Sequence, residues 1–171
     1  MPATPEELFA YLDRLGIVHT TVSHRPLFTV EQSRALRGQI PGGHTKNLFL
    51  RDKKGAFYLV VALEDAAIAL KDLHRRLGAS GRFSFGSAEA MGELLGVARG
   101  SVTPFAAIND TTSQVTVVLD RAMLDHDVLN FHPLVNTMTT SISKTGLLQF
   151  LAATGHDPRV EAVSGEATGA D

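Results

Sequence analysis

Apolar residues recur along this chain at two spacings, and the spacings predict where helices and strands form. Near the start, Thr4-Pro5-Glu6-Glu7 combines a capping threonine, a proline suited to the first helical position and a glutamate that completes a capping box. Leu8, Leu12 and Leu15 follow at helical spacing, and Gly16 ends the stretch. The chain therefore opens with an amphipathic helix.

Runs rich in β-branched and aromatic residues alternate with further helical stretches along the rest of the chain. Turn residues, above all glycine and proline, separate these segments. The predicted strands cover residues 17–23, 44–51, 56–63, 82–85, 106–109, 114–119, 128–131 and 138–142. The predicted helices after the first one cover residues 29–37, 67–77, 87–95 and 143–153.

The order of these elements predicts the fold class. Residues 44–51 and 56–63 form a hairpin, and the second strand is so apolar that we expect it in the centre of a sheet. Hairpins and irregular crossings favour an α+β fold with a mixed, mostly antiparallel sheet that is partly barrel-like and flanked by helices. We expect one domain over residues 1–157. Residues 158–171, which become small and polar, are expected to form a disordered tail.

Composition narrows the possible functions only slightly. The chain has 171 residues, 44% of them hydrophobic, and a net charge of -2, so the whole molecule is not a general nucleic-acid binder. It has no cysteine, which excludes disulfides and thiolate catalysis. We see no leader peptide and no apolar run of about 20 residues, and we expect a cytoplasmic protein with no membrane contact.

The stretch Pro41–Leu50 has the most unusual pattern, because a glycine-rich turn leads directly into a strand that contains a lysine. Side chains alternate between the two faces of a strand, so Lys46 shares a face with Leu48 while Asn47 lies on the other. A lysine among apolar residues either enters a pocket or its rim, or reaches solvent, and the alternation alone does not decide between these.

Two further polar segments interrupt apolar sequence. Gly100–Pro104 is either a surface turn or a loop whose backbone amides hold a carbonyl oxygen or an oxyanion. His132 precedes Pro133, which favours extended backbone; it is either a partnered structural residue or part of a pocket lining. The scattered histidines lack the spacing of a metal site, no Gly-x-Ser-x-Gly motif is present, and the glycine turn lacks the spacing of a phosphate-binding loop.

These segments, in this order, resemble a known family. Pro41–Leu50, Gly100–Pro104 and Phe131–Thr137 are similar to motifs of the freestanding trans-editing proteins related to the editing domain of prolyl-tRNA synthetase, the YbaK-like superfamily. Within it, the alanyl-tRNA(Pro) deacylases are the most similar group. The resemblance covers residues 4–155.

The resemblance implies hydrolysis of the ester between alanine and the 3′ end of tRNA(Pro), without a metal or another cofactor. In this interpretation Lys46 holds the aminoacyl-adenosine end by its charge, and a substrate ribose hydroxyl assists the attacking water. Asn47 lies in an adjacent subsite or is reoriented by a bulge after Gly43. The remaining implied site residues are Gly100, Ser101, Thr103 and Pro104 as the amide loop, His132 as a pocket wall, and Phe28, Val30 and Leu48 as apolar walls.

Recognition of tRNA implies a basic surface on this weakly acidic protein. The candidates are Arg51, Lys53 and Lys54 after the lysine strand and Arg34 and Arg37 before it, although each can equally be a solvated surface charge. The expected partner is the acceptor end of tRNA(Pro), with prolyl-tRNA synthetase or an elongation factor as further candidates and a monomer or weak homodimer as the assembly. The alternatives are Cys- or Ser-tRNA as substrate, or a noncatalytic tRNA- or synthetase-binding module.

Overall fold

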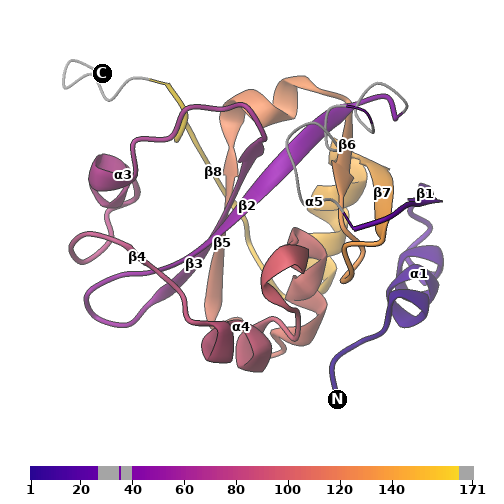
Figure 1. Cartoon of the computed structure of the whole chain (residues 1–171), viewed down its shortest axis with the longest axis horizontal. Coiled ribbons are helices and arrows are strands. Elements are labelled where there is room, and N and C mark those ends of the chain that lie inside the picture. The colour runs from indigo at the N-terminus through magenta and orange to yellow at the C-terminus, as the bar shows by residue number, and fades with distance from the viewer. Residues whose placement is uncertain (27–34, 36–39, 166–171) are drawn as a thin grey trace.

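The computed structural model describes residues 1–26, 35 and 40–165, and in this part of the chain eight strands form one mixed sheet (Figure 1). The strand order is β1-β7-β6-β2-β3-β5-β8, with β4 paired to β2 off this path. The strands are β1 (His19–Ser23), β2 (Gly43–Arg51), β3 (Phe57–Leu63), β4 (Ser84–Phe85), β5 (Val115–Asp120), β6 (Val128–Phe131), β7 (Met138–Ser143) and β8 (Arg159–Glu161).

Helices cover both faces of this sheet. The α-helices are α1 (Pro5–Arg14), α3 (Leu70–Leu77), α4 (Ala88–Leu94) and α5 (Lys144–Ala153), and short 3-10 helices span Arg99–Ser101, Pro104–Asn109 and Arg121–Asp125. In Figure 1, α3 lies at the opposite end of the molecule from α1. None of the described helices is long and apolar enough to cross a membrane.

Pairing of the strands confirms the α+β class. The pairs β1–β7, β6–β7, β2–β3 and β2–β4 are antiparallel, whereas β2–β6, β3–β5 and β5–β8 are parallel. The pairing path ends at β1 and at β8, so the mostly antiparallel sheet curves without closing into a barrel. The predicted hairpin is confirmed as β2–β3, and β3 is central because it pairs with both β2 and β5.

Alternation along β3 separates two apolar layers. Leu59 and Val61 belong to the larger cluster, in which α1, α4 and α5 pack against one face of the sheet. Tyr58 and Val60 belong to a smaller cluster, in which α3 contributes Leu73 and Leu77 against the other face. Since side chains alternate along β2 as well, its two polar residues Lys46 and Asn47 lie in different layers.

Local sequence signals set several element ends as predicted. Thr4 accepts a hydrogen bond from the N–H of Glu7, and the carboxylate of Glu7 accepts one from the N–H of Thr4, so the capping box forms. Ser87 and Ser143 cap α4 and α5 with one hydrogen bond each: their hydroxyls accept from the N–H groups of Ala90 and Gly146.

Two predictions about local structure are wrong. Residues 106–109 form part of a 3-10 helix, not a strand, because Pro104 starts a helical turn that Thr103 caps through the N–H of Phe105. The expected disordered tail from residue 158 is also wrong for the part described, since β8 pairs with β5 and Val163 is buried. The predicted helix over residues 29–37 lies almost entirely outside the described residues.

A buried polar pair holds the C-terminal segment against the body of the protein. One carboxylate oxygen of Asp110 lies 2.9 Å from Nε2 of His156, and both side chains are almost completely buried. The same carboxylate accepts the N–H groups of Gln114 and Val115 at the start of β5. Nδ1 of His156 lies 2.9 Å from the hydroxyl of Thr154. This network links the end of α5 to the turn before β5.

Candidate functional site

The candidate site lies along one edge of β2, where the described part of the sheet leaves the strand uncovered. On this edge β6 pairs only with Gly43 and His44, and β4 pairs only with Leu50 and Arg51. Figure 1 shows β6 beside one end of β2 and β4 beside the other. Between them, no strand in the described ranges pairs with this edge at residues 45–49.

Asn47 is the residue whose polar groups this edge leaves available. In a strand, successive residues direct their N–H and C=O groups to alternate sides. The carbonyl of His44 accepts from Glu64 on the β3 side, and that of Phe49 accepts from Gly86 on the opposite side. Asn47 is in phase with Phe49, so its backbone groups point to the uncovered edge. Its side-chain Oδ1 is buried and has no hydrogen-bond partner among the described residues.

Lys46 is half-buried, on the opposite face of the strand from Asn47. Its Nζ donates a hydrogen bond of 2.5 Å to the carbonyl of Ala66, just beyond the end of β3. The β2–β3 register runs without interruption from Thr45 opposite Leu63 to Arg51 opposite Phe57. No bulge therefore turns Lys46 and Asn47 to one side. The structure therefore shows Asn47 on the strand face opposite Lys46, the first of the two orientations considered.

Asn130 of β6, which the sequence analysis did not single out, holds the glycine turn that precedes Lys46. Its Nδ2 donates to the carbonyls of Pro41, at 3.0 Å, and Gly43, at 3.3 Å. Its Oδ1 accepts from the hydroxyl of Ser141. Gly42 has a φ of 102°, and a Cβ there would lie 2.9 Å from the carbonyl of Val128. The turn thus needs glycine, and Asn130 ties it to β6. An asparagine inside an apolar strand was the available signal.

His132 follows β6 and lies beside a second histidine, with 6.3 Å between the ring centroids of His24 and His132. Burial lowers the pKa of His132 and the nearby His24 lowers it further, while the contact of Nδ1 with the Met138 carbonyl acts in the opposite direction. Because a carbonyl only accepts, Nδ1 carries the proton, and Nε2 of the neutral ring is an acceptor. Nε2 of His24 lies 2.8 Å from the hydroxyl oxygen of Thr139.

The Gly100–Pro104 loop lies next to the segment after His132. A Cβ on Gly100 would come within 3.2 Å of the side-chain amide of Asn136, so glycine permits this close approach. The side chains of Ser101, Thr103 and Pro104 are buried and face away from solvent. The N–H of Ser101 donates to Ala98. Pro104 has no N–H, so the amides of Gly100, Val102 and Thr103 are the loop's candidate donors.

The remaining predicted residues lie in three places. Leu48 is half-buried and packs against the smaller apolar cluster with Lys46 on the same face. Arg51, Lys53 and Lys54 are exposed around the β2–β3 turn. The other predicted wall and tRNA-binding residues fall outside the described residues: Phe28, Val30, Arg34 and Arg37.

The β2–β3 turn is held by a buried carboxylate. Asp52 accepts the N–H groups of Lys54 and Ala56 on one oxygen and that of Ser80 on the other. Burial by itself raises the pKa of Asp52, but the surrounding backbone N–H groups outweigh it, so the pKa is lowered below 3.8. The exposed lysines of this turn therefore project from a firmly held backbone.

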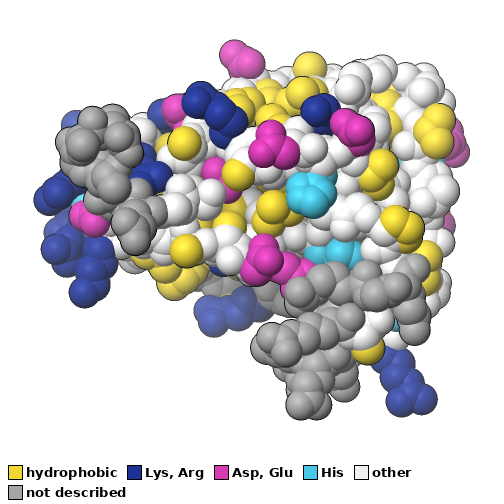
Figure 2. Space-filling model, turned by 90° about the horizontal axis from the view of Figure 1, so that it is seen from above, with side chains coloured by type: hydrophobic (Ala, Val, Ile, Leu, Met, Phe, Trp, Pro, Cys, Tyr) yellow, Lys and Arg dark blue, Asp and Glu magenta, His cyan; other side chains and the backbone are white. Residues whose placement is uncertain are grey.

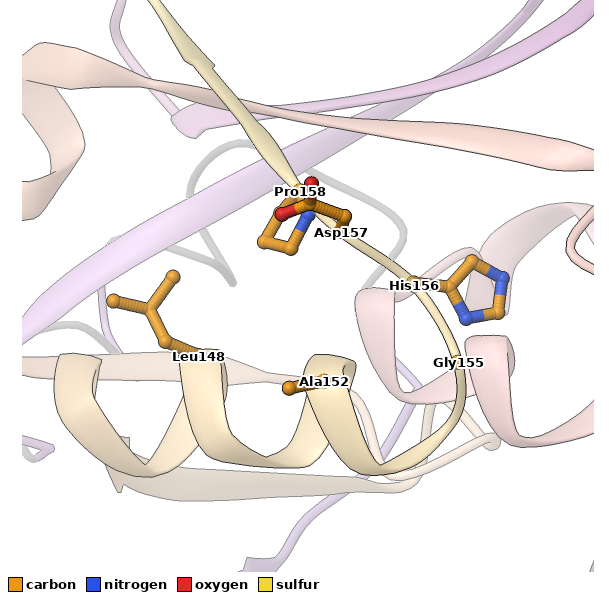
Figure 3. Close-up of a pocket in the computed structure, with 6 residues that line it drawn as sticks. All are labelled: Leu148, Ala152, Gly155, His156, Asp157 and Pro158. Atoms are coloured by element: carbon orange, nitrogen blue, oxygen red, sulfur yellow. The ribbon is translucent and has the colours of Figure 1, made fainter.

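Surface pockets lined by described residues include one at α5 and one beside the glycine turn. One, of about 560 Å³, is lined mostly by apolar groups of α5 and the segment after it; in Figure 3 the His156 ring points away from Leu148. Both nitrogens of His156 are engaged by Thr154 and Asp110, so this ring offers the pocket no free donor or acceptor. The other, of about 380 Å³, borders the glycine turn and includes His44, His126 and Asp65. No cluster suited to a metal ion occurs among the described residues.

Fold and site together define a class: an α+β protein in which an unpaired stretch of a strand edge carries a lysine and an asparagine. The chain belongs to the aminoacyl-tRNA editing domain family, whose model matches residues 24–150. The resemblance predicted from the three motifs is confirmed.

Individual relatives agree with this assignment. The chain is 40% identical over 156 residues to the prolyl-tRNA synthetase associated domain-containing protein 1 of Mus musculus, covering 89% of this chain and 92% of that protein. It is 35% identical over 152 residues to the prolyl-tRNA editing protein ProX of Acetoanaerobium sticklandii, covering 88% and 92%. A crystal structure described as a proposed trans-editing enzyme for prolyl tRNA synthetase superposes with a TM-score of 0.70 at 19% identity, covering 97% of this chain and 100% of the other. At that identity, the superposition shows the shared fold.

Proposed function

We propose that the protein hydrolyses the ester that joins a wrongly attached amino acid to the 3′ end of a tRNA, acting in trans, with Ala-tRNA(Pro) as the substrate. A synthetase site built for proline cannot exclude the smaller alanine, because a few missing methylene contacts are worth only about 1–3 kcal/mol. A second site that admits alanine and rejects proline removes the error. The name of the ProX relative, a prolyl-tRNA editing protein, supports this proposal.

Asn47 is the observation that carries the proposal. A buried polar atom without a partner costs about 1–3 kcal/mol, so proteins rarely keep one that serves no purpose. Among the described residues, the Oδ1 of Asn47 is one of three such side-chain atoms, with His74 Nδ1 and Asp120 Oδ2, and it is the one in the strand that carries Lys46. The end of an aminoacyl-tRNA offers the donors that this acceptor lacks, namely the α-ammonium group and a ribose hydroxyl. Binding of the substrate would therefore give the Oδ1 of Asn47 a hydrogen-bond donor.

The proposed chemistry needs positioning more than a strong nucleophile. Water attacks the ester carbonyl, the bond to the ribose oxygen breaks, and the proton passes to that oxygen with help from the neighbouring ribose hydroxyl. Amides of the loop at Gly100 stabilise the developing oxyanion. Lys46 leaves the Ala66 carbonyl to hold a phosphate or ribose oxygen. Neutral His132 forms part of the wall that sets the size of the amino-acid pocket.

The test is deacylation of Ala-, Ser- and Cys-tRNA(Pro) by the wild-type protein and by Lys46→Ala. We expect Ala-tRNA(Pro) to be hydrolysed fastest and Lys46→Ala to lower kcat/KM roughly a hundredfold to a thousandfold, the range typical of a lost electrostatic group in an active site. Lys144→Ala is the matched control, because the Nζ of Lys144 also donates to a backbone carbonyl, that of Leu124, away from this edge.

Each alternative has its own outcome in this assay. Faster hydrolysis of Ser- or Cys-tRNA(Pro) would reassign the substrate. Binding of tRNA without hydrolysis of any of the three would indicate a noncatalytic module. Equal loss of activity in Lys46→Ala and Lys144→Ala would mean that both lysines act only through folding. Association with prolyl-tRNA synthetase is a further part of the proposal, which copurification of the two proteins would test.

A further inference from the structure

Phe85 is the one aromatic side chain among the large hydrophobic side chains that are exposed in the described part of the chain, with 64% of its surface accessible. Phe83, two residues earlier, packs edge-on against Tyr58 with 5.0 Å between ring centroids. Phe85 belongs to neither apolar cluster. Phe83, just before the short strand β4, is thus partly buried against the smaller apolar cluster, whereas Phe85 within β4 is left in solvent.

The position of Phe85 distinguishes it from an ordinary exposed apolar residue. It lies directly opposite Leu50 in the β2–β4 pair, and the following residue, Gly86, donates its N–H to the Phe49 carbonyl. Phe85 thus stands where the uncovered edge of β2 ends. Cross-strand partners point to the same face, so Phe85 lies on the face that also carries Lys46. The aromatic ring and the lysine mark the two ends of one strand edge.

Positive charge accompanies Phe85. Arg82 is exposed just before β4, and Lys53 is exposed in the β2–β3 turn. The turn and the segment leading to β4 are joined, since the N–H of Lys53 donates to the Ser80 carbonyl and the Lys53 side chain lies over Gly81. Figure 2 shows lysine and arginine side chains gathered toward the end of the molecule where α3 lies, away from the acidic and histidine side chains in the middle of that view.

An exposed aromatic ring with positive charges in the adjoining segments suits an unpaired nucleic-acid base, which stacks on the ring while its phosphates meet those charges. The length of β2 between Lys46 and Leu50 also matches a short single strand of RNA. Lys46 and Leu50 are four strand steps apart, which is about 13 Å at about 3.3 Å per step. Stacked nucleotides advance about 3.4 Å each, so this distance spans about four of them. The unpaired 3′ end of a tRNA has this length scale.

We propose that Phe85, assisted by the positive charges of Arg82 and Lys53 in the adjoining segments, is a stacking platform for an unpaired base upstream of the ester in the 3′-terminal strand of the RNA substrate. This inference rests on the proposed function for the identity of that RNA. The platform holds the single strand along the uncovered edge of β2 while its terminal nucleotide reaches Lys46. It contributes to binding of the RNA and takes no part in the chemistry at the ester.

The experiment uses the full chain and an RNA hairpin without an attached amino acid. The hairpin ends in the tRNA(Pro) acceptor sequence and carries 2-aminopurine in its unpaired 3′ segment. Stacking quenches the fluorescence of this base. We expect Phe85→Ala to remove the quenching and to weaken binding roughly 5- to 150-fold, the range for loss of one base–aromatic stack. Phe85→Trp should retain both, whereas Phe85→Leu, which keeps the apolar volume, should lose both.

Two controls separate this proposal from simpler explanations. Val18 is 83% exposed, in the segment before β1, and Val18→Ala should leave binding unchanged. Hydrolysis of 3′-alanyl-adenosine, which has no upstream bases, should be the same in wild type and Phe85→Ala, while KM for alanylated hairpin rises in the variant.

The outcomes distinguish the platform from the proposed function. Quenching and affinity that are equal in wild type and Phe85→Ala would overturn the platform, and so would full binding by Phe85→Leu. Quenching that depends on Phe85 in a protein that hydrolyses no aminoacyl-tRNA would support the platform and overturn the proposed function.

Discussion

Replacement of Asn130 by aspartate tests how the fold holds the turn in front of Lys46. Asparagine and aspartate have nearly the same shape, so the change exchanges an NH₂ group for an oxygen and little else. The carbonyls of Pro41 and Gly43 can only accept hydrogen bonds, which shows that the NH₂ group of Asn130 faces them. Asn130→Asp therefore removes two donors and places a carboxylate oxygen against two carbonyl oxygens.

The expected loss follows from these contacts. Two net hydrogen bonds are worth about 1–3 kcal/mol together. Asn130 is only 3% exposed, so the new charge is buried, and an unpaired buried charge adds a penalty of several kcal/mol unless it takes up a proton. We expect Asn130→Asp to lower the free energy of unfolding by about 3–5 kcal/mol at pH 7. Ser141→Ala, which removes only the hydroxyl donor to Asn130, should cost about 1 kcal/mol.

Urea unfolding followed by circular dichroism is the appropriate assay, because the chain has no tryptophan and two tyrosines. The loss in free energy of unfolding caused by Asn130→Asp should be smaller at acid pH, because the introduced carboxyl is then protonated and can donate one hydrogen bond. A variant that unfolds within about 1 kcal/mol of wild type at pH 7, or no more easily than Ser141→Ala, would refute the role assigned to the amide.

Two further predictions concern buried carboxylates. Asp52→Asn should lower the free energy of unfolding by about 1–3 kcal/mol at pH 7, because the turn loses a charged acceptor. Since the pKa of Asp52 is lowered in the folded state, this stabilisation is present above its unfolded value of 3.8 and disappears as the pH falls through the folded value; a deficit that is constant between pH 7 and pH 2 would contradict the assignment. His156→Phe should cost about 3–5 kcal/mol by leaving Asp110 without its partner, and the double variant His156→Phe/Asp110→Asn should lose less than the sum of the single changes; strict additivity in urea unfolding would show that the two side chains do not interact.

Comparison of prediction and structure shows which signals in the sequence are local. The capping box at Thr4 was predictable because its partners lie within one helical turn, and the β2–β3 hairpin because two apolar strands flank a short polar turn. The strand predicted over residues 106–109 failed because apolar composition alone does not distinguish a buried strand from a buried helical turn, and the proline at 104 decided for the helix.

The C-terminal end of the chain shows the opposite case. Residues near position 160 carry no strong strand pattern by themselves. Arg159–Glu161 form β8 because β5 offers them a parallel edge, and Asp120 accepts the N–H groups of Val163 and Ser164 beyond it. Partners so distant in sequence leave no periodic signal in the segment that they order.

For the candidate site, the sequence by itself predicted that Lys46 and Asn47 occupy opposite faces of a regular strand, since alternation follows from backbone geometry. The uninterrupted β2–β3 register then excluded the bulge that the sequence left open. The sequence also marked Gly100–Pro104 and His132 as polar interruptions. Only the tertiary structure decided that β6 and β4 pair with the two ends of β2, that no strand in the described part of the chain pairs with this edge at Asn47, and that Asn130 ties the glycine turn to β6. Those features depend on which strands become neighbours. Strand pairing is set by packing of the whole chain, and no segment contains that information on its own.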